Sequence, residues 1–308
     1  MPGKQSKRDV QKFSRHFADN IVSLHEDFVN MTYRHGGYEH FKISDPKPRD
    51  IHKATVRDRL VHHAIYRVLY PFFSRTFIAD SYSCQLDKGT HRATRRFRQF
   101  SDKASKNNTK TVWILKCDIK KFFASIDQTI LLKQLKLYIP DLRIVNLLEE
   151  VISSFSWQLN KGLPLGNLTS QLFVNIYMTP LDQFMKHKLK AKYYLRYADD
   201  FVIESRDKKW LESLIPKIKG FLMNNLKLQL HSKKVIIQNL ASGVDFLGWV
   251  HFPNHRVLRT TTKRRMSARI KVHPTNETLQ SYLGLLSHGN THKIKTQILN
   301  DYFLSRGE

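Results

Sequence analysis

The sequence has few cysteines, no long apolar run and no recognisable export signal. Its two cysteines, Cys84 and Cys117, are too few for a disulfide scaffold or for a zinc finger with paired cysteines. No stretch approaches the roughly 20 uncharged apolar residues of a membrane-spanning helix. Residues 1–17 lack the apolar core of a signal peptide. We therefore expect a cytoplasmic protein that is not associated with a membrane.

Acidic residues are scarce relative to basic ones. The chain has 26 Asp and Glu against 52 Lys and Arg, which gives a net charge of +26 over 308 residues. This excess predicts attraction to a polyanion, either nucleic acid or an anionic membrane. The lack of membrane segments favours nucleic acid. Apolar residues make up 41% of the chain, which is enough to bury a substantial core.

The densest run of positive charge is residues 259–271, RTTTKRRMSARIK. Its cationic residues are Arg259, Lys263, Arg264, Arg265, Arg269 and Lys271. Such a run is typical either of a solvated helix face or of a surface that binds nucleic-acid phosphates. The charge of the whole chain favours phosphate binding.

Hydrophobic spacing predicts an alternation of helices and strands. Apolar residues at three- and four-residue intervals indicate helices at 8–35, 56–78, 129–157 and 208–225. Residues 111–119, TVWILKCDI, are typical of a strand buried on both faces. Residues 192–205 predict two strands joined by a tight turn at Ala198-Asp199, where a turn without glycine is expected to be strained. This pattern indicates an α/β or α+β domain.

Three aspartates stand out. Asp118 ends the apolar strand, and Asp199 and Asp200 occupy the tight turn between apolar strands. Carboxylates held side by side repel one another unless a cation lies between them. Two Mg²⁺ ions that catalyse phosphoryl transfer need such a group. The alternative is that Asp199-Asp200 forms an ordinary solvated turn.

The order of motifs resembles that of reverse transcriptases, most closely the bacterial group II intron-like branch. The matching segments are PKPRDI (46–51), SYSCQLDKGTHRA (81–93), CDIKKFFASID (117–127), GLPLGNLTSQLFVNIY (162–177), YADD (197–200), HSKKV (231–235) and VDFLGW (244–249). They are similar to two fingers motifs, the first metal-binding Asp, the glycine loop, the Y-x-D-D hairpin, the catalytic-lysine strand and the primer grip. The resemblance extends over nearly the whole chain.

The resemblance implies an RNA-directed DNA polymerase with a right-hand fold. Residues 1–110 would form the fingers. Residues 111–250 would form a palm built on a small antiparallel sheet backed by helices, and residues 251–308 would form a short, basic, helical thumb. The implied cofactor is two Mg²⁺ ions, for which Mn²⁺ is a possible substitute. The implied ligands are template RNA, cDNA or primer, and deoxynucleoside triphosphates.

The family also implies roles for single residues. Asp118 and Asp199 would bind both metal ions with Asp200 in support, and the carbonyl of Ile119 would help to hold the metal bound to the nucleotide. The ring of Phe123 would exclude a ribose 2′-hydroxyl, which argues against an RNA-dependent RNA polymerase. Plain core packing is the alternative role for Phe123.

Other residues are assigned to the nucleotide and the primer. Arg49 and Lys88 would pair with the triphosphate, for which the planar Arg group is well suited; for Lys88 a solvated loop cation is an equally good explanation. Lys234, or its neighbour Lys233, would protonate the leaving pyrophosphate. The resemblance also assigns Leu165, Gly166 and Gln171 to the nucleotide-binding site, and Phe246, Leu247 and Gly248 to the primer grip.

The glycine loop departs from the usual family pattern. Most relatives have Pro-Gln-Gly followed by Ser-Pro, whereas this chain has Pro164-Leu165-Gly166 followed by Ser170-Gln171. This replacement is similar to the enzymes of diversity-generating retroelements, which copy a template RNA with frequent errors opposite adenine. Leu cannot form the hydrogen bonds of Gln, so less energy would separate right from wrong base pairs. Neutral drift is the alternative.

The resemblance leaves several cellular roles open. A diversity-generating enzyme would act in a bacterium, or from a phage genome in the host cytoplasm, with a small basic accessory protein that forms a helical ring. The alternatives are a group II-like polymerase in phage defence or a stand-alone role, and a non-catalytic RNA-binding scaffold. Because the chain ends at residue 308, we expect no maturase or endonuclease domain and no splicing activity.

Overall fold

The computed structural model describes residues 3–44 and 48–306, and in this part the chain forms short helices around three antiparallel sheets. The α-helices are α1 (Arg8–Arg15), α2 (Phe17–Val29), α3 (Val56–Phe73), α4 (Thr90–Ala104), α5 (Phe122–Ser125), α6 (Gln128–Lys136), α7 (Leu142–Ser153), α8 (Leu168–Gln183), α9 (Lys208–Leu226), α10 (Thr260–Val272), α11 (Asn276–Leu286) and α12 (His292–Arg306). The strands are β1 (Tyr38–Ile43), β2 (Arg49–Ala54), β3 (Trp113–Asp118), β4 (Tyr194–Tyr197), β5 (Asp200–Ser205), β6 (Ile236–Asn239), β7 (Val244–Phe246), β8 (Trp249–His251) and β9 (Arg256–Leu258).

Polar side chains fix where several helices begin. In each case a side-chain oxygen accepts a hydrogen bond from a backbone N–H of the first turn, which would otherwise lack a partner. The capping residues of α3, α6, α7, α9 and α11 are Thr55, Asp127, Asp141, Asp207 and Thr275. These helices therefore start at residues that the local sequence specifies.

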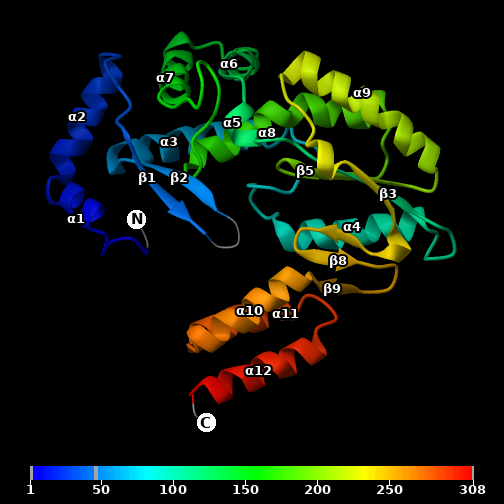
Figure 1. Cartoon of the computed structure of the whole chain (residues 1–308). Coiled ribbons are helices and arrows are strands. Elements are labelled where there is room, and N and C mark those ends of the chain that lie inside the picture. Colours follow the sequence, from blue (N-terminus) through cyan, green and yellow to red (C-terminus); the bar gives the residue numbers. More distant parts are fainter. Residues whose placement is uncertain (1–2, 45–47, 307–308) are drawn as a thin grey trace.

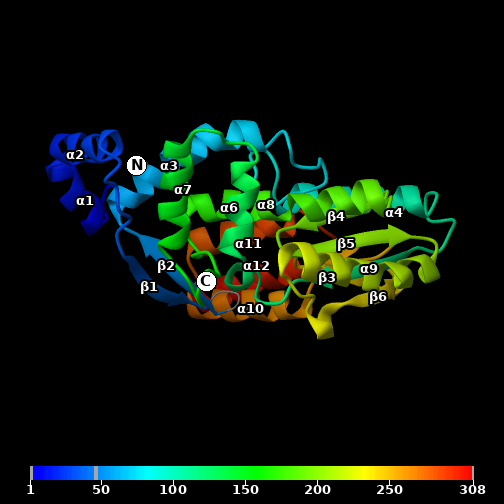
Figure 2. The same cartoon turned by 90° about the horizontal axis from the view of Figure 1, so that it is seen from above.

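The four-stranded sheet, in the order β4-β5-β3-β6, is covered on both faces (Figure 1). Leu115 and Cys117 of β3 are fully buried in the large core that includes α8 and α9. Ile114, on the opposite face, packs in a second core with α4. Figure 2 shows the strands from above, in the order β4, β5, β3 and β6. The strand order places β3 between β5 and β6, with an apolar core against each of its faces. This explains the almost continuous apolar sequence of β3.

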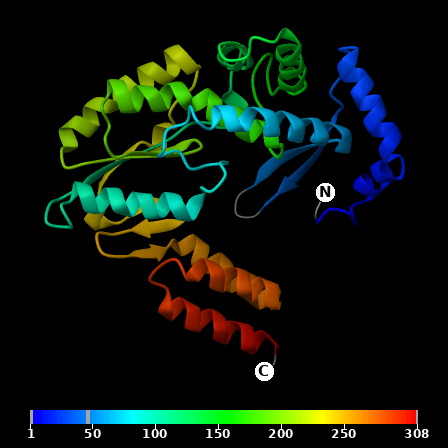
Figure 3. The same ribbon diagram turned by 180° about the vertical axis from the view of Figure 1, so that it is seen from behind.

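A third core joins the C-terminal helices to the sheet β7-β8-β9. Trp249 and Leu258 of the sheet pack with Met266 and Ile270 of α10, and with residues of α11 and α12. Seen from behind, these helices extend away from the central sheet, and the β1-β2 hairpin lies on the same side of the molecule (Figure 3). The C-terminal segment thus has a core of its own.

The structure confirms some predicted elements and corrects others. The strand at 111–119, the hairpin at 192–205 and the helix at 208–225 are present. The single helix predicted at 8–35 is wrong, because the helix is interrupted at His16 and ends at Val29. The helix predicted at 129–157 is two helices, α6 and α7, separated by a segment that contains Pro140, as expected of a residue that disfavours helical geometry before it. Part of PKPRDI, residues 46 and 47, lies outside the described residues.

Within residues 3–44 and 48–306, no helix is both long enough and apolar enough to cross a bilayer.

Candidate active site

The three aspartates come together at one end of the central sheet. Asp118, the last residue of β3, is directly opposite Asp200, the first residue of β5. Asp199 precedes Asp200 in the turn, and its carbonyl oxygen accepts a hydrogen bond of 3.2 Å from the N–H of Ile119. Side chains directly opposite each other in an antiparallel pair lie on the same face of the sheet. Segments that are far apart in the sequence therefore deliver carboxylates to one place.

The turn between β4 and β5 is strained. Tyr197 pairs with Asp200, which leaves Ala198 and Asp199 as a two-residue turn. Ala198 has φ +54°, and a hairpin turn with positive φ at its first central residue normally has glycine there. An alanine in this region costs roughly 1–3 kcal/mol. The expected strain is thus located next to two of the aspartates.

Three cations surround the carboxylates. The Lys234 ammonium donates to both oxygens of Asp118, at 3.0 and 2.9 Å. Lys116 lies on β3 two residues before Asp118, with its Nζ 3.7 Å from Asp200 Oδ2. Burial raises the pKa of Asp199, and the charge of Arg49, the first residue of β2, opposes this rise. Lys233, the alternative to Lys234, is exposed, so the geometry favours Lys234.

The charged forms of the Asp199 and Asp200 carboxyl groups are disfavoured in the folded protein. Burial raises the pKa of Asp199, the Asp118 charge raises it further, and Lys234 opposes both. Burial likewise raises the pKa of Asp200 to about 6, and Lys116 opposes this shift. Asp200 Oδ1 is buried and has no hydrogen-bond partner among the described residues. A buried acceptor without a partner is costly, and a bound cation would satisfy it.

The donors present suit Mg²⁺ better than a metal that needs a complete protein cage. In the described part of the chain, no three His, Cys, Asp or Glu side chains are grouped so as to hold a metal ion. Mg²⁺ is normally bound through one or two carboxylates, with water and substrate phosphates completing its shell. The side chains of Asp118 and Asp200 are 17% and 23% exposed, so they are partly accessible. The residues fit this kind of ion.

The glycine loop is bound to the strand that carries Arg49. The Leu165 carbonyl accepts a hydrogen bond of 2.9 Å from His52 N–H. Asn167 donates from Nδ2 to the His52 carbonyl at 2.8 Å. Gly166 has φ +109°, and a Cβ there would lie 2.8 Å from the Ile51 side chain, so glycine is required. These contacts fix the half-buried Leu165 beside β2.

Phe123 and Gln171 lie on either side of this loop in the chain. Phe123, in α5, is half-buried, packs edge-on against Phe122 with ring centres 5.6 Å apart, and its carbonyl accepts a hydrogen bond from Leu163 N–H. Its ring packs against the large core but is not enclosed by it, so both predicted roles remain compatible with its position. Gln171 is a half-buried residue in the first turn of α8, just after the loop.

Lys88 is used differently from the prediction. Its ammonium donates to three backbone carbonyls of the preceding loop, those of Ile78, Ala79 and Ser81, at 3.4, 2.9 and 2.7 Å. Burial lowers its pKa. Lys88 is therefore not a solvated loop cation, and its ammonium group is directed at these carbonyls and not at the carboxylates. This geometry favours a structural role, and triphosphate binding by Lys88 stays a prediction.

The predicted primer-grip residues form the tight turn between β7 and β8. Phe246 is fully buried and stacks on Phe97 of α4, with ring centres 5.5 Å apart. Leu247 and Gly248 both have positive φ, +51° and +86°, as the two central residues of a type I′ turn do. Lys116 donates to the Asp245 carbonyl at 2.6 Å. This bond links the turn to the carboxylate strand.

The basic run forms α10 and the residue before it. Arg259 precedes the helix and forms an ion pair with Asp245. Lys263 is half-buried, and Lys271 lies 3.9 Å from Asp301. The helix presents a largely cationic outer face, because its arginines are exposed while the apolar residues between them are buried. The exposed residues are Arg264, Arg265 and Arg269, and the buried ones are Met266 and Ile270.

Residues 43–251, more than half of the chain, match the family described as reverse transcriptase (RNA-dependent DNA polymerase). The chain belongs to this family. Protein YkfC of Escherichia coli (strain K12) is 25% identical over 259 residues, which cover 71% of this chain and 66% of YkfC. The group II intron-encoded protein LtrA of Lactococcus lactis subsp. cremoris is 24% identical over 315 residues, which cover 79% of this chain and 50% of LtrA. The chain thus spans between half and two thirds of the length of these two relatives.

Solved structures show the same fold. Apo telomerase from Candida tropicalis has a TM-score of 0.57 at 12% identity, with 89% of this chain and 58% of that chain covered. Telomerase from Candida albicans, in complex with a TWJ fragment of telomeric RNA, has a TM-score of 0.54 at 12% identity, with 88% and 55% covered. The predicted fold class, a mixed α/β right-hand polymerase, is confirmed for this reverse transcriptase.

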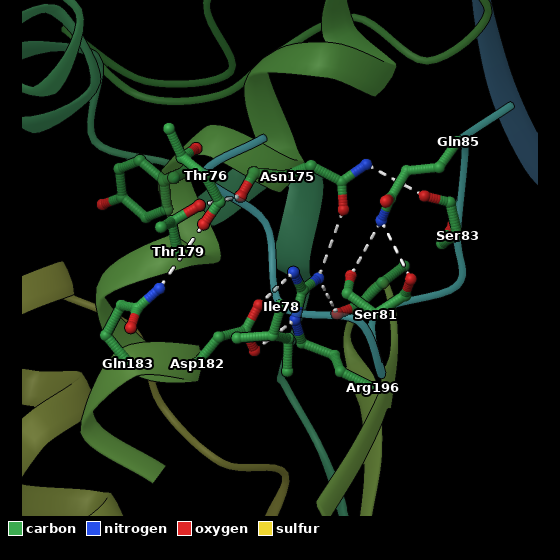
Figure 4. Close-up of polar contacts among 12 residues, drawn as sticks. Thr76, Ile78, Ser81, Ser83, Gln85, Asn175, Thr179, Asp182, Gln183 and Arg196 are labelled. Carbon is green, nitrogen blue, oxygen red and sulfur yellow. Dashed lines mark hydrogen bonds and ion pairs between the residues drawn. The ribbon is translucent and has the colours of Figure 1, made fainter. Parts of the chain in front are cut away.

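Sequence reasoning missed the polar network behind the Y-x-D-D turn. Arg196 and Asp182 are both 0% exposed and form a two-bond ion pair. Figure 4 shows Arg196 between Asp182, on α8, and Ser81, with Asn175 above it. Side chains two residues apart on a strand share a face. Arg196 therefore lies on the same face of β4 as the buried Tyr194, and this spacing was the signal for it in the sequence. Lys116 was missed in the same way, two residues before Asp118 on β3.

Proposed function

We propose that this reverse transcriptase makes cDNA from a template RNA by two-metal nucleotidyl transfer, error-prone within a diversity-generating retroelement. The observation that carries the polymerase part is the convergence of Asp118, Asp199 and Asp200 beside Lys234 and Arg49. Aspartates gathered among cations, with a buried oxygen left unsatisfied, suit a site that binds metal and triphosphate together.

Each residue has a definite task in this proposal. Asp118, Asp199 and the carbonyl of Ile119 would hold two Mg²⁺ ions, with Asp200 in support; when bound, these ions stabilise the attacking and leaving oxygens of phosphoryl transfer. Arg49 would pair with phosphate oxygens of the incoming nucleotide. Lys234, whose ammonium is hydrogen-bonded to Asp118, would donate a proton to the departing pyrophosphate.

Residues 1–110, 111–250 and 251–308 would act as fingers, palm and thumb. The β7-β8 turn at Leu247 and Gly248 would press against the primer end, where a glycine permits close backbone approach. The cationic face of α10 would hold the template–primer duplex through its phosphates, with little dependence on sequence. The separate apolar core of the C-terminal helices supports this division.

The error-prone character rests on Leu165. Its backbone is bonded to His52 in the strand that begins with Arg49, so the loop lies beside the strand that carries the proposed triphosphate ligand. An aliphatic side chain there offers no hydrogen bond to a base pair, which weakens discrimination. A small basic accessory protein that forms a ring would be the protein partner.

Two other functions remain candidates. A group II-like polymerase in phage defence or a stand-alone role would share the chemistry but would lack a template and variable repeat pair among its neighbouring genes. A non-catalytic RNA-binding scaffold is disfavoured because every carboxylate is present and the aspartates retain their costly proximity.

Primer extension on an RNA template with Mg²⁺, followed by sequencing of the product, tests the proposal. We expect DNA synthesis with errors concentrated opposite adenine. Asp199→Asn with Asp200→Asn should abolish synthesis, whereas the matched change of two exposed aspartates, Asp19→Asn with Asp87→Asn, should not. Synthesis that survives the first pair would remove these carboxylates as metal ligands. Accurate synthesis would remove the diversity-generating assignment alone.

A further inference from the structure

The Y-x-D-D turn has a buried cation behind it that no step of the proposed chemistry uses. The Arg196 side chain is fully buried on β4. It donates through Nε and Nη2 to the two oxygens of Asp182, at 2.8 and 2.7 Å. Burial alone would lower the pKa of Arg196, but Asp182 raises it more, so the side chain stays charged. A buried ion pair is weak evidence for stability, because desolvation offsets most of the attraction.

The third nitrogen of the Arg196 guanidinium group, Nη1, is directed at the turn. It donates to the Ala198 carbonyl at 3.1 Å and lies 3.5 Å from Asn175 Oδ1. The Ala198 carbonyl belongs to the peptide unit that leads into Asp199, so this bond fixes the plane of that peptide. Ala198 is the residue with φ +54°. A charged donor, held rigidly by Asp182, thus opposes relaxation of the strained turn.

The same arginine connects the turn to the loop before α4. Arg196 N–H donates to the Asp80 carbonyl, and its own carbonyl accepts from Tyr82 N–H, both at 3.0 Å. Gln85 donates to the carbonyl and hydroxyl of Ser81, and Lys88 donates to the same carbonyl (Figure 4 shows the Gln85 bonds). The loop that carries the motif SYSCQLDKG is therefore bound to the back of the hairpin.

We propose that Arg196, held by Asp182, is a positioning residue that orients the Ala198–Asp199 peptide and so sets the Asp199 carboxylate for metal binding. This rests on the proposed function, since it deepens the account of the same site. The network built on Ser81, Gln85 and Lys88 transmits the position of the loop to the turn. Loss of the Nη1 bond should reduce turnover without unfolding the protein.

The test replaces the pair by apolar residues, Arg196→Met with Asp182→Leu. Such replacements of a buried ion pair are often neutral or stabilising, so the variant should fold, as judged by circular dichroism and urea midpoint. We expect kcat in primer extension to fall about tenfold or more, as on loss of a residue that orients a metal ligand. The Mg²⁺ concentration for half-maximal activity should rise, and KM for the nucleotide should change less. A wild-type enzyme without activity would refute the proposed function instead.

Two further variants complete the design. Tyr194→Phe removes the hydroxyl that donates to Asp182 Oδ1 at 2.7 Å but leaves the bond to Ala198, so kcat should be kept. Arg196→Lys retains the positive charge, but a single ammonium cannot bind both Asp182 oxygens and the Ala198 carbonyl, so kcat should fall. If the double variant does not fold, this variant tests whether Arg196 positions the turn. Wild-type kcat and Mg²⁺ dependence in the folded double variant, or in Arg196→Lys, would overturn the proposal.

Discussion

Replacing Asp200 by asparagine should stabilise the protein when no metal is bound. The folded protein raises the pKa of this carboxyl from 3.8 to about 6, mainly by burial. Each pKa unit corresponds to about 1.4 kcal/mol, so keeping the group ionised costs about 3 kcal/mol. Asparagine has nearly the same shape and no charge, so Asp200→Asn should remove this cost. The side chain is only 23% exposed, so solvent screening reduces the effect little.

The pH dependence gives the prediction a definite sign. Because the folded pKa of Asp200 lies above the unfolded value, the folded state binds the proton more tightly, and the free energy of unfolding falls as pH rises from about 4 to above about 6. The stabilisation by Asp200→Asn should therefore be largest, about 3 kcal/mol, at about pH 8. It should fall to roughly half at about pH 5 and disappear below about pH 4.

Urea unfolding with a chelator present, followed by tryptophan fluorescence at about pH 8 and about pH 5, measures this difference. The matched control is Asp87→Asn at the surface, where Asp87 has φ +55°, a conformation that asparagine also accepts; it should change stability by less than about 0.5 kcal/mol. Equal stability of wild type and Asp200→Asn at the higher pH, or a gain that is the same at both pH values, would refute the reasoning.

Three further substitutions test other parts of the site. Phe123→Ala should raise ribonucleotide incorporation relative to deoxynucleotide by ~10-fold or more; unchanged sugar selectivity, measured by competing the two nucleotides, would leave Phe123 as a core residue. Leu165→Gln should restore about 1 kcal/mol of discrimination, which means about fivefold fewer errors opposite adenine by product sequencing, and an unaltered error spectrum would separate Leu165 from fidelity. Arg264→Gln with Arg265→Gln should weaken template binding equally across sequences and reduce the slope against log salt by about 2. Unchanged affinity would contradict the thumb assignment.

Exchange of two exposed lysines on α9, Lys209→Gln with Lys217→Gln, is the control for the arginine pair. It removes the same charge from a helix to which the proposed function assigns no contact with nucleic acid. A loss of binding as large as that of the arginine variant would show that net charge matters more than the location of the charge.

The carboxylate group could be predicted because each aspartate carries a local signal. Asp118 ends an apolar strand, and Asp199 and Asp200 interrupt another apolar segment. The resemblance to reverse transcriptases implies that they bind metal together, and the register that places Asp118 opposite Asp200 brings them to one end of the sheet. The Leu165 loop was placed near the site for the same reason.

Contacts between distant segments could not be predicted in this way. Nothing local distinguishes Lys88, a cation in a polar loop, from a lysine that faces a phosphate; its three carbonyl partners become visible only when the loop closes on itself. Arg196 shares its strand face with buried residues, but its partner Asp182 lies on a helix, 14 residues earlier in the chain. The break at His16 in the predicted helix 8–35 has no proline or glycine to mark it.

The residues that break local rules mark the site. Ala198 occupies a turn position that favours glycine, Asp200 has a buried oxygen without a hydrogen-bond partner among the described residues, and Arg196 is a charge in the core. Each departure is unfavourable for folding, and all three lie on the same hairpin. Natural sequences keep such conflicts where function requires them and are consistent elsewhere. A chain selected for stability alone would have glycine in place of Ala198, asparagine in place of Asp200 and an apolar residue in place of Arg196. Their presence together on one hairpin therefore argues for a working polymerase rather than an RNA-binding scaffold.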